Sequence, residues 1–274
     1  MTYTSGELLF AFALTIFAGL STGIGSALAF FAKKTSTRFL TGSLGFSAGV
    51  MIYVAMIEIF VKGKDAVESS VGPATGYLYA TMGFFGGILL IAVIDKLVPS
   101  FENPHEIHDI NEMLDADEAE LKKRKNLHRM GIFSALAIAI HNFPEGLATF
   151  IGALQDPALG LSIAVAIAIH NIPEGIAVSV PLYYATGSRK KAFFYSVLSG
   201  LSEPLGAMLG YFLLFRYIND FVFGLLFAAV AGIMVFISLD ELLPAAEKYG
   251  EHHIAMYGVV GGMAVMAISL VLFV

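Results

Sequence analysis

Long apolar stretches follow one another along most of the chain and are separated by short polar segments. An α-helix rises about 1.5 Å per residue, so about 20 apolar residues span the ~30 Å hydrocarbon core of a bilayer. Stretches of that length predict eight membrane-crossing helices, near residues 7–31, 38–61, 75–95, 130–153, 159–183, 192–215, 220–242 and 252–273. The pattern therefore predicts an all-α integral membrane protein with a single transmembrane domain over residues 1–274.

The composition agrees with this pattern. Hydrophobic residues make up 57% of the 274 residues, charged residues make up 14%, and the mean hydropathy is +0.77, which excludes a water-soluble domain of this size. The chain has no cysteine, which excludes a disulfide framework and a thiolate metal site. A net charge of −6 without a basic aromatic patch gives no indication of nucleic-acid binding.

The positive charges predict the orientation of the chain. Lysine and arginine concentrate in cytoplasmic loops, and 13 of the 16 fall on one side of the eight-helix arrangement. The opposite side carries only Lys62, Lys64 and Arg216. The chain is therefore expected to cross the cell membrane several times with both termini outside. The long connection at residues 96–129 is expected in the cytoplasm as a solvated linker.

Three segments of the first half resemble three segments of the second half. "GLSTGIGSAL" from Gly19 matches "GLSEPLGAML" from Gly200, "AGVMIYVAMIEI" from Ala48 matches "AGIMVFISLDEL" from Ala231, and "GGILLIA" at Gly86 weakly matches "GGMAVMA" at Gly261. Helices 1–3 thus correspond to helices 6–8, in a 3+2+3 arrangement. Because five helices separate the partners, an odd number, the two copies are inverted. Inverted repeats are typical of secondary transporters, whose substrate sites lie near the bilayer midplane.

The two central helices carry the same polar motif. "AIAIHNFPEG" at residues 137–146 and "AIAIHNIPEG" at residues 166–175 belong to segments that match at 10 of 12 positions, so helix 4 and helix 5 form a second inverted pair. His141 and His170 each lie about twelve residues into their helix, close to the middle of the bilayer. Ionisable groups at that depth are costly unless they have partners or water, which indicates a functional site.

Each motif places a histidine, an asparagine and a glutamate on one helix face, because positions i, i+3 and i+4 are neighbours there. The two sets are His141, Asn142 and Glu145, and His170, Asn171 and Glu174. Pro144 and Pro173 remove a backbone hydrogen bond and free carbonyl oxygens beside them. Imidazole, carboxylate and amide oxygen without thiolate suit zinc and other divalent first-row metals.

Further acidic residues extend the candidate site. Glu203 in "SGLSEPLGA" also lies about twelve residues into its helix and precedes a proline. Glu58 and Glu241 occupy equivalent repeat positions near opposite ends of helices 2 and 7, where they could guide cations at the entrance and exit, with Asp240 assisting at the exit. Ordinary interfacial charges are the alternative interpretation. Two weaker candidate metal sites lie in polar connections, at His105 and His108 and at His252 and His253.

These motifs resemble those of the ZIP (Zrt-, Irt-like) divalent metal transporters, and most closely the bacterial ZupT-type members. The similarity rests on HNFPEG in helix 4, HNIPEG in helix 5, SEPLGA in helix 6 and the eight-helix pattern. It implies a transporter, not an enzyme, that moves metal into the cytosol. Zinc is the expected substrate, with Fe²⁺, Mn²⁺, Cd²⁺ and Co²⁺ as further candidates. The resemblance also implies frequent homodimers and an elevator-like motion of helices 1, 4, 5 and 6 against helices 2, 3, 7 and 8.

The resemblance further implies a binuclear centre in which Glu145 and Glu174 bridge two metals. One metal would bind His141, Glu145, His170 and Glu174, and the other would bind Asn142, Asn171 and Glu203. Two alternatives from other classes remain at this point: a metal-selective cation channel with the same ligands, and an intramembrane zinc hydrolase. The hydrolase has less support because the chain lacks an HExxH motif.

Overall fold

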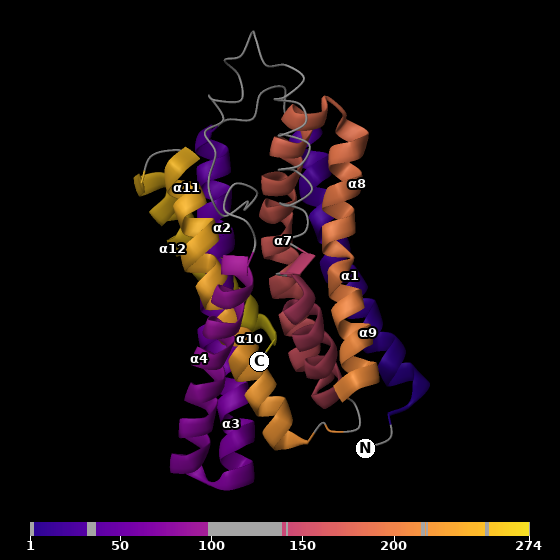
Figure 1. Cartoon of the computed structure of the whole chain (residues 1–274), viewed down its shortest axis with the longest axis vertical. Helices are drawn as coiled ribbons and strands as arrows, with labels where there is room; N and C mark the ends of the chain where they lie inside the picture. Colours follow the sequence, from indigo (N-terminus) through magenta and orange to yellow (C-terminus); the bar gives the residue numbers. More distant parts are fainter. Residues whose placement is uncertain are drawn as a thin grey trace.

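A computed structural model describes residues 3–31, 37–97, 139–140, 142–214, 217, 219–249 and 252–273 (Figure 1). Within these ranges the chain is helical with short turns and contains no strand. Six helical stretches in them are long and apolar enough to cross a membrane: Ser5–Leu28, Arg38–Val71, Pro73–Lys96, Pro157–Val180, Asp220–Glu247 and His252–Leu272. The protein is therefore an all-α membrane protein, as the hydrophobic pattern predicts.

The helices of the first part are α1 (Ser5–Phe31), α2 (Thr37–Val54), the π-helix η1 (Ala55–Ile59), α3 (Phe60–Val71) and α4 (Pro73–Leu97). Residues 142–155 are also helical. The second part contains α7 (Pro157–Thr186), α8 (Arg189–Gly200), α9 (Ser202–Leu214), α10 (Asp220–Ile237), the π-helix η2 (Ser238–Leu242), α11 (Leu243–Tyr249) and α12 (His252–Phe273).

Two helices continue well past the ends that hydropathy predicts. The helix expected over residues 38–61 runs through η1 and α3 to Val71, and the one expected over 220–242 runs through η2 and α11 to Tyr249. The extensions carry charged residues, but each buries one face. In α3 that face consists of Gly63 and Val67, which pack against α10. Tertiary packing of this face keeps the backbone helical where the apolar stretch has ended.

The helix expected over residues 192–215 is divided into α8 and α9 at Leu201. Pro204 has no amide hydrogen, so the carbonyl of Gly200 lacks its usual helical donor four residues later. That carbonyl instead lies against Gly19 of α1, where a side chain would overlap it. The break therefore lies beside a close backbone contact between α1 and the end of α8.

Tight turns between helices use the residues that such turns require. Gly72, between α3 and α4, has a φ of 88°, and Gly187, which ends α7, has a φ of 63°. Both values lie in the left-handed region that favours glycine. At the start of α7 the Asp156 side chain accepts a hydrogen bond from the amide of Ala158 at 2.9 Å, and Pro157 occupies the first helical position.

The helices form two bundles. The first, called the α7 bundle, consists of α1, residues 142–155, α7, α8 and α9; the second, called the α10 bundle, consists of α2, η1, α3, α4, α10, η2, α11 and α12. Figure 1 shows α1, α8 and α9 on one side, α3, α4 and α12 on the other, and α7 between them. Contacts between the bundles include those of α7 with α2 and α12 and those of residues 142–155 with α10.

Close backbone approaches occur within each bundle. In the α7 bundle a side chain at Gly25 would overlap the carbonyl oxygen of Ile172. In the α10 bundle a side chain at Gly49 would overlap that of Val259. Small residues let membrane helices approach until their backbones touch, which increases the packing contact between them. The glycines therefore allow the helices of each bundle to pack closely against each other.

Candidate metal site

The polar residues that the motifs single out are buried in the α7 bundle. Six of the seven lie in the described ranges, on residues 142–155, on α7 and on α9, and none is more than 2% exposed. They are Asn142, Glu145, His170, Asn171, Glu174 and Glu203. The seventh, His141, lies outside the described residues. Burying three carboxylates in an apolar bundle is unfavourable unless cations or hydrogen-bond donors compensate them, so this cluster indicates a cation site.

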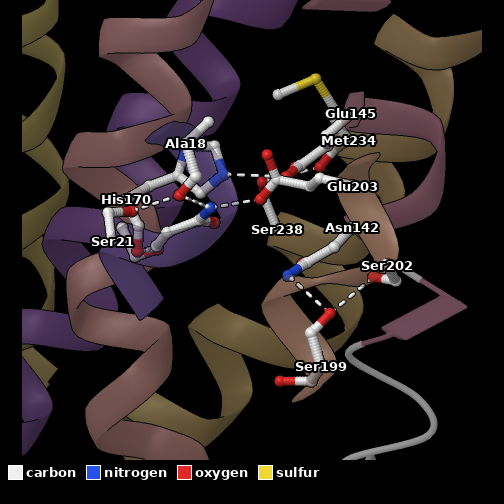
Figure 2. Close-up of polar contacts among 12 residues, drawn as sticks. Ala18, Ser21, Asn142, Glu145, His170, Ser199, Ser202, Glu203, Met234 and Ser238 are labelled. Carbon is white, nitrogen blue, oxygen red and sulfur yellow. Dashed lines mark hydrogen bonds and ion pairs between the residues drawn. The ribbon is translucent and has the colours of Figure 1, made fainter. Parts of the chain in front are cut away.

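Direct contacts join the two motifs to each other and to Glu203. His170 Nε2 lies 3.2 Å from Glu145 Oε2, and Figure 2 shows these two side chains pointing toward each other. The amide nitrogen of Asn171 donates to Glu203 Oε1 at 2.5 Å and to the carbonyl of Ala18 at 3.0 Å. Residues far apart in the sequence thus meet as the motifs predict.

The asparagine side chains have their oxygens available for a cation. Asn142 uses its amide nitrogen to donate to the carbonyl of Ser199 at 3.5 Å, and Asn171 uses its nitrogen as described above. Asn142 Oδ1 and Asn171 Oδ1 are both buried, and neither accepts a hydrogen bond from the residues that the structure describes. Buried polar atoms normally have a partner, and amide oxygens are ligands for divalent cations. The donor set therefore fits a metal ion.

Within the described ranges, no group of three or more histidine, aspartate and glutamate side chains is arranged closely enough to hold a metal ion. His170 and Glu145 lie at hydrogen-bond distance from each other instead, as do Asn171 and Glu203. A cation that binds here would replace these hydrogen bonds with ligand bonds.

The glycine that ends each motif explains how the cluster is assembled. A side chain at Gly146 would overlap the carbonyl of Glu203, and one at Gly175 would overlap the carbonyl of Thr22. Because Gly146 and Gly175 each follow a motif glutamate, the close approach brings α9 to Glu145 and α1 to Glu174. The PEG sequence thus combines a candidate metal ligand with the contact that positions the neighbouring helix.

Comparison with known proteins agrees with the geometry. A family model described as "ZIP Zinc transporter" matches residues 98–270. The chain belongs to the ZIP family. Curated relatives named "Zinc transporter ZupT" include one from Chlorobaculum parvum, 62% identical over 269 residues, which covers 98% of this chain and 99% of the relative. Another, from Streptococcus mutans, is 62% identical over 270 residues, covering 98% and 100%.

A third relative with the same name, from Clostridium perfringens, is 59% identical over 277 residues and covers 98% of this chain and 97% of its own length. The resemblance inferred from the motifs is therefore confirmed over nearly the whole chain. The ZIP family model and the relatives carry the names of zinc transporters, and this places the chain among transporters and not enzymes.

The structure of this ZIP protein also shows serines around the site that sequence reasoning missed. Ser26 and Ser196 donate to the carbonyl of Gly175 at 3.1 and 3.5 Å and lie 2.5 Å from each other. Ser47 donates to the carbonyl of His170 at 3.2 Å. All three are fully buried. A serine in a membrane helix gives no sequence signal of its own because it commonly bonds a carbonyl of its own helix.

The predicted entrance and exit residues lie in the two π-helices of the ZIP chain. Glu58 is in η1, and Asp240 and Glu241 are in η2. Glu58 is partly exposed, and its charged neighbours are Lys62 and Asp156, of which Asp156 was not predicted. Single π-helical turns occur frequently at functional sites. Glu58 and Asp156, whose charges influence each other, belong to different bundles.

The weaker histidine candidates have different outcomes. His252 Nδ1 lies 2.7 Å from Glu247 Oε1, and the rings of His252 and His253 are 5.7 Å apart, with both histidines exposed. His252 thus contacts an exposed glutamate at the surface, and a metal site at these two histidines stays a prediction. His105 and His108 lie outside the described residues.

Proposed function

We propose that this ZIP family member is an uptake transporter that carries divalent metal, zinc above all, across the cell membrane into the cytosol. The observation that carries the proposal is the buried cluster of one histidine, two asparagines and three glutamates in an apolar helix bundle. Its atoms are typical ligands of zinc. Fe²⁺, Mn²⁺, Cd²⁺ and Co²⁺ accept the same ligands and are proposed as further substrates. The names of the relatives, zinc transporters, support the choice of zinc.

The proposed centre holds two metals that Glu145 and Glu174 bridge. The first metal is also bound by His141 and His170, and the second is also bound by Asn142, Asn171 and Glu203. The contact between His170 and Glu145 supports the first set, and the hydrogen bond between Asn171 and Glu203 supports the second. The buried amide oxygens of both asparagines support it further.

An inverted repeat with eight crossing helices accounts for contacts in the α7 bundle. The repeat pairs Gly25 with Gly206, and the motif match pairs Ile172 with Phe143. Gly25 lies against the carbonyl of Ile172, and Gly206 lies against the carbonyl of Phe143. One contact is thus the counterpart of the other, which supports the proposed symmetry.

The α10 bundle has the same property. The register that pairs Ala48 with Ala231 also pairs η1 with η2, residue for residue. Within it Gly49 lies against the carbonyl of Val259, and its counterpart Gly232 lies against that of Phe84. Two π-helices and two glycine contacts at corresponding places support a common ancestry of the two halves.

Transport is proposed to occur by movement of the α7 bundle, which carries the site, against the α10 bundle. Close glycine contacts hold helices together within each bundle, whereas none of the glycine contacts among the described residues joins α7 to α2 or α12. The α7 bundle would therefore slide along its boundary with the α10 bundle at a lower free-energy cost than helices within one bundle could slide past each other. We further propose that both termini lie outside, that Glu58 faces the entrance and Glu241 the exit, and that the protein forms homodimers in the bilayer.

Zinc flux into liposomes tests the proposed function. A divalent ion that enters an inside-negative compartment gains about 4.6 kcal/mol per 100 mV, which supports roughly 10³-fold accumulation. We expect saturable zinc uptake that iron, manganese and cadmium inhibit, and slower uptake by Glu203→Ala, which loses one ligand of the second metal. A current that rises linearly with voltage and does not saturate would indicate a channel. Flux equal to that of protein-free liposomes would contradict the proposal.

Zinc uptake is expected to weaken as the external pH falls. Metal binding requires neutral imidazole and ionised carboxylate, so protons compete with zinc for its ligands. A single competing proton lowers the apparent affinity by up to about tenfold per pH unit. Uptake measured from pH 8 to 5 at a fixed membrane potential checks this. An affinity that stayed constant across the histidine range would count against imidazole as a ligand.

A further inference from the structure

One hydrogen bond near the site joins the two bundles. Ser47 belongs to α2 in the α10 bundle, and it donates to the carbonyl oxygen of His170 on α7 at 3.2 Å. Both residues are fully buried. The side-chain hydrogen bonds of Asn171 and Ser26, by contrast, connect elements of the α7 bundle. Ser47 therefore contacts the backbone of a proposed metal ligand from outside the bundle that would move.

A hydroxyl is suited to a contact that forms and breaks. Helical serines commonly bond a carbonyl three or four residues earlier, as Ser21 does with Ala18 and Ser238 does with Met234. Ser47 has such carbonyls in its own helix, at Ser43 and Leu44, yet it donates across to α7. If α7 moved away, the hydroxyl would lose this bond, and turning to its own helix would offset only part of the cost.

The corresponding place in the second half has no hydroxyl. The register that pairs Ala48 with Ala231 pairs Ser47 with Val230 on α10. Val230 lines an apolar cavity of about 510 Å³ between α10, α4 and α9, and Ile140 and Phe143 are among its other lining residues. The bundles are thus joined by a hydrogen bond where α2 meets α7. Where α10 faces the helix of residues 142–155, the counterpart of α7 in the repeat, an apolar cavity separates them.

We propose that Ser47 is a positioning residue that holds the α7 bundle in the described arrangement, and that this bond has no counterpart at Val230. In an inverted repeat the alternative state is reached when the two halves exchange their conformations. The exchanged state would place Val230 where Ser47 now donates, and valine has no donor. The hydroxyl therefore favours the described arrangement over its exchanged counterpart. This inference rests on the proposed movement of the bundles.

Threonine and valine at position 47 provide a matched pair, because they have the same shape and differ in the hydroxyl. A neutral hydrogen bond changes a two-state equilibrium by roughly two- to tenfold. We expect Ser47→Val to raise the population of the alternative arrangement by about that factor relative to Ser47→Thr. Val230→Thr adds a donor at the corresponding place and is expected to shift the equilibrium in the same direction as Ser47→Val.

Spin labels measure this population directly, because the chain has no cysteine that would compete for labelling. Cysteines at Ser70 on α3 and at Ala158 on α7 are exposed and lie on different bundles. Pulsed electron resonance on the doubly labelled protein in lipid, with and without zinc, gives the distance distribution. Ser179→Ala is the control, since Ser179 is a buried serine on α7 that bonds the carbonyl of Ile176 in its own helix.

The outcomes separate the role of Ser47 from the proposed transport mechanism. If two label–label distances are present and their relative populations change in Ser47→Val, but not in Ser47→Thr or Ser179→Ala, the role of Ser47 is supported. If the relative populations are the same in Ser47→Val and Ser47→Thr, that role is overturned and the bundle movement is left intact. A single distance in every variant, with and without zinc, overturns both. If Val230→Thr leaves the relative populations unchanged, the proposed difference between Ser47 and Val230 is overturned.

Discussion

Glutamine in place of Glu145 is expected to lower zinc uptake at least about 100-fold, because the buried carboxylate loses its charge while the side chain keeps its shape. Removing one partner from a buried charge pair costs about 3 kcal/mol or more, which corresponds to a loss of affinity of roughly two orders of magnitude. Glu145 is 1% exposed and contacts His170, so solvent cannot replace the missing charge. Radiolabelled zinc uptake into proteoliposomes measures the effect.

A partly exposed glutamate provides the control for this substitution. Glu68 on α3 forms an i,i+4 ion pair with Lys64 at 3.8 Å, away from the candidate site. We expect Glu68→Gln to transport zinc at close to the wild-type rate, because this residue is not among the proposed metal ligands and ion pairs that water still reaches contribute little. If Glu145→Gln transported zinc as well as Glu68→Gln, the carboxylate of Glu145 would not be a ligand and the proposed centre would be wrong.

Leucine at Gly87 is expected to destabilise the protein by at least about 3 kcal/mol, whereas leucine at the adjacent Gly86 is expected to be tolerated. A side chain at Gly87 would overlap the carbonyl oxygen of Ala229 on α10, so α4 and α10 would have to separate. At Gly86 nothing lies within 4 Å of the added carbon. Both substitutions lie in α4 and change helix propensity equally, so their difference isolates the packing.

Thermal unfolding in detergent, followed by size-exclusion chromatography, measures the difference between the two variants. We expect Gly87→Leu to yield little monodisperse protein and Gly86→Leu to behave like the wild type. Equal stability of the two would show that α4 does not pack against α10 at this point. The α10 bundle would then not be a rigid unit, and the proposed movement between bundles would lose its basis.

The candidate site was predictable from sequence to the extent that its ligands repeat in register. The HN-x-PEG motif places Asn142 and Glu145 on one helix face, and the structure finds both buried, with Glu145 in contact with His170. Glu203 was predictable because it lies at the same depth and precedes a proline, and its hydrogen bond to Asn171 agrees with this. Ionisable residues near the bilayer midplane stand out in a sequence because burying them there is costly, so they occur mainly where they have a functional role.

The remaining partners of the site were not predictable. Ser47, Ser199 and Ala18 meet the motif residues through backbone carbonyls or hydroxyls that any helix provides. Which of them reaches the site depends on how the helices are rotated and how deeply they are offset against each other. Hydropathy does not encode either quantity, since it records only the affinity of a segment for the bilayer.

The sequence by itself determined that the protein is a helical membrane protein, which family it belongs to, and which polar residues are candidates for the metal, because segment length, hydropathy and a repeated motif are local properties. The tertiary structure decided where helices end, as in the extension to Val71 and the break at Leu201. It also decided that the helices form two bundles and that Ser47 bonds His170 across their boundary. These features depend on which helix faces meet, and that is set by the packing of many side chains at once.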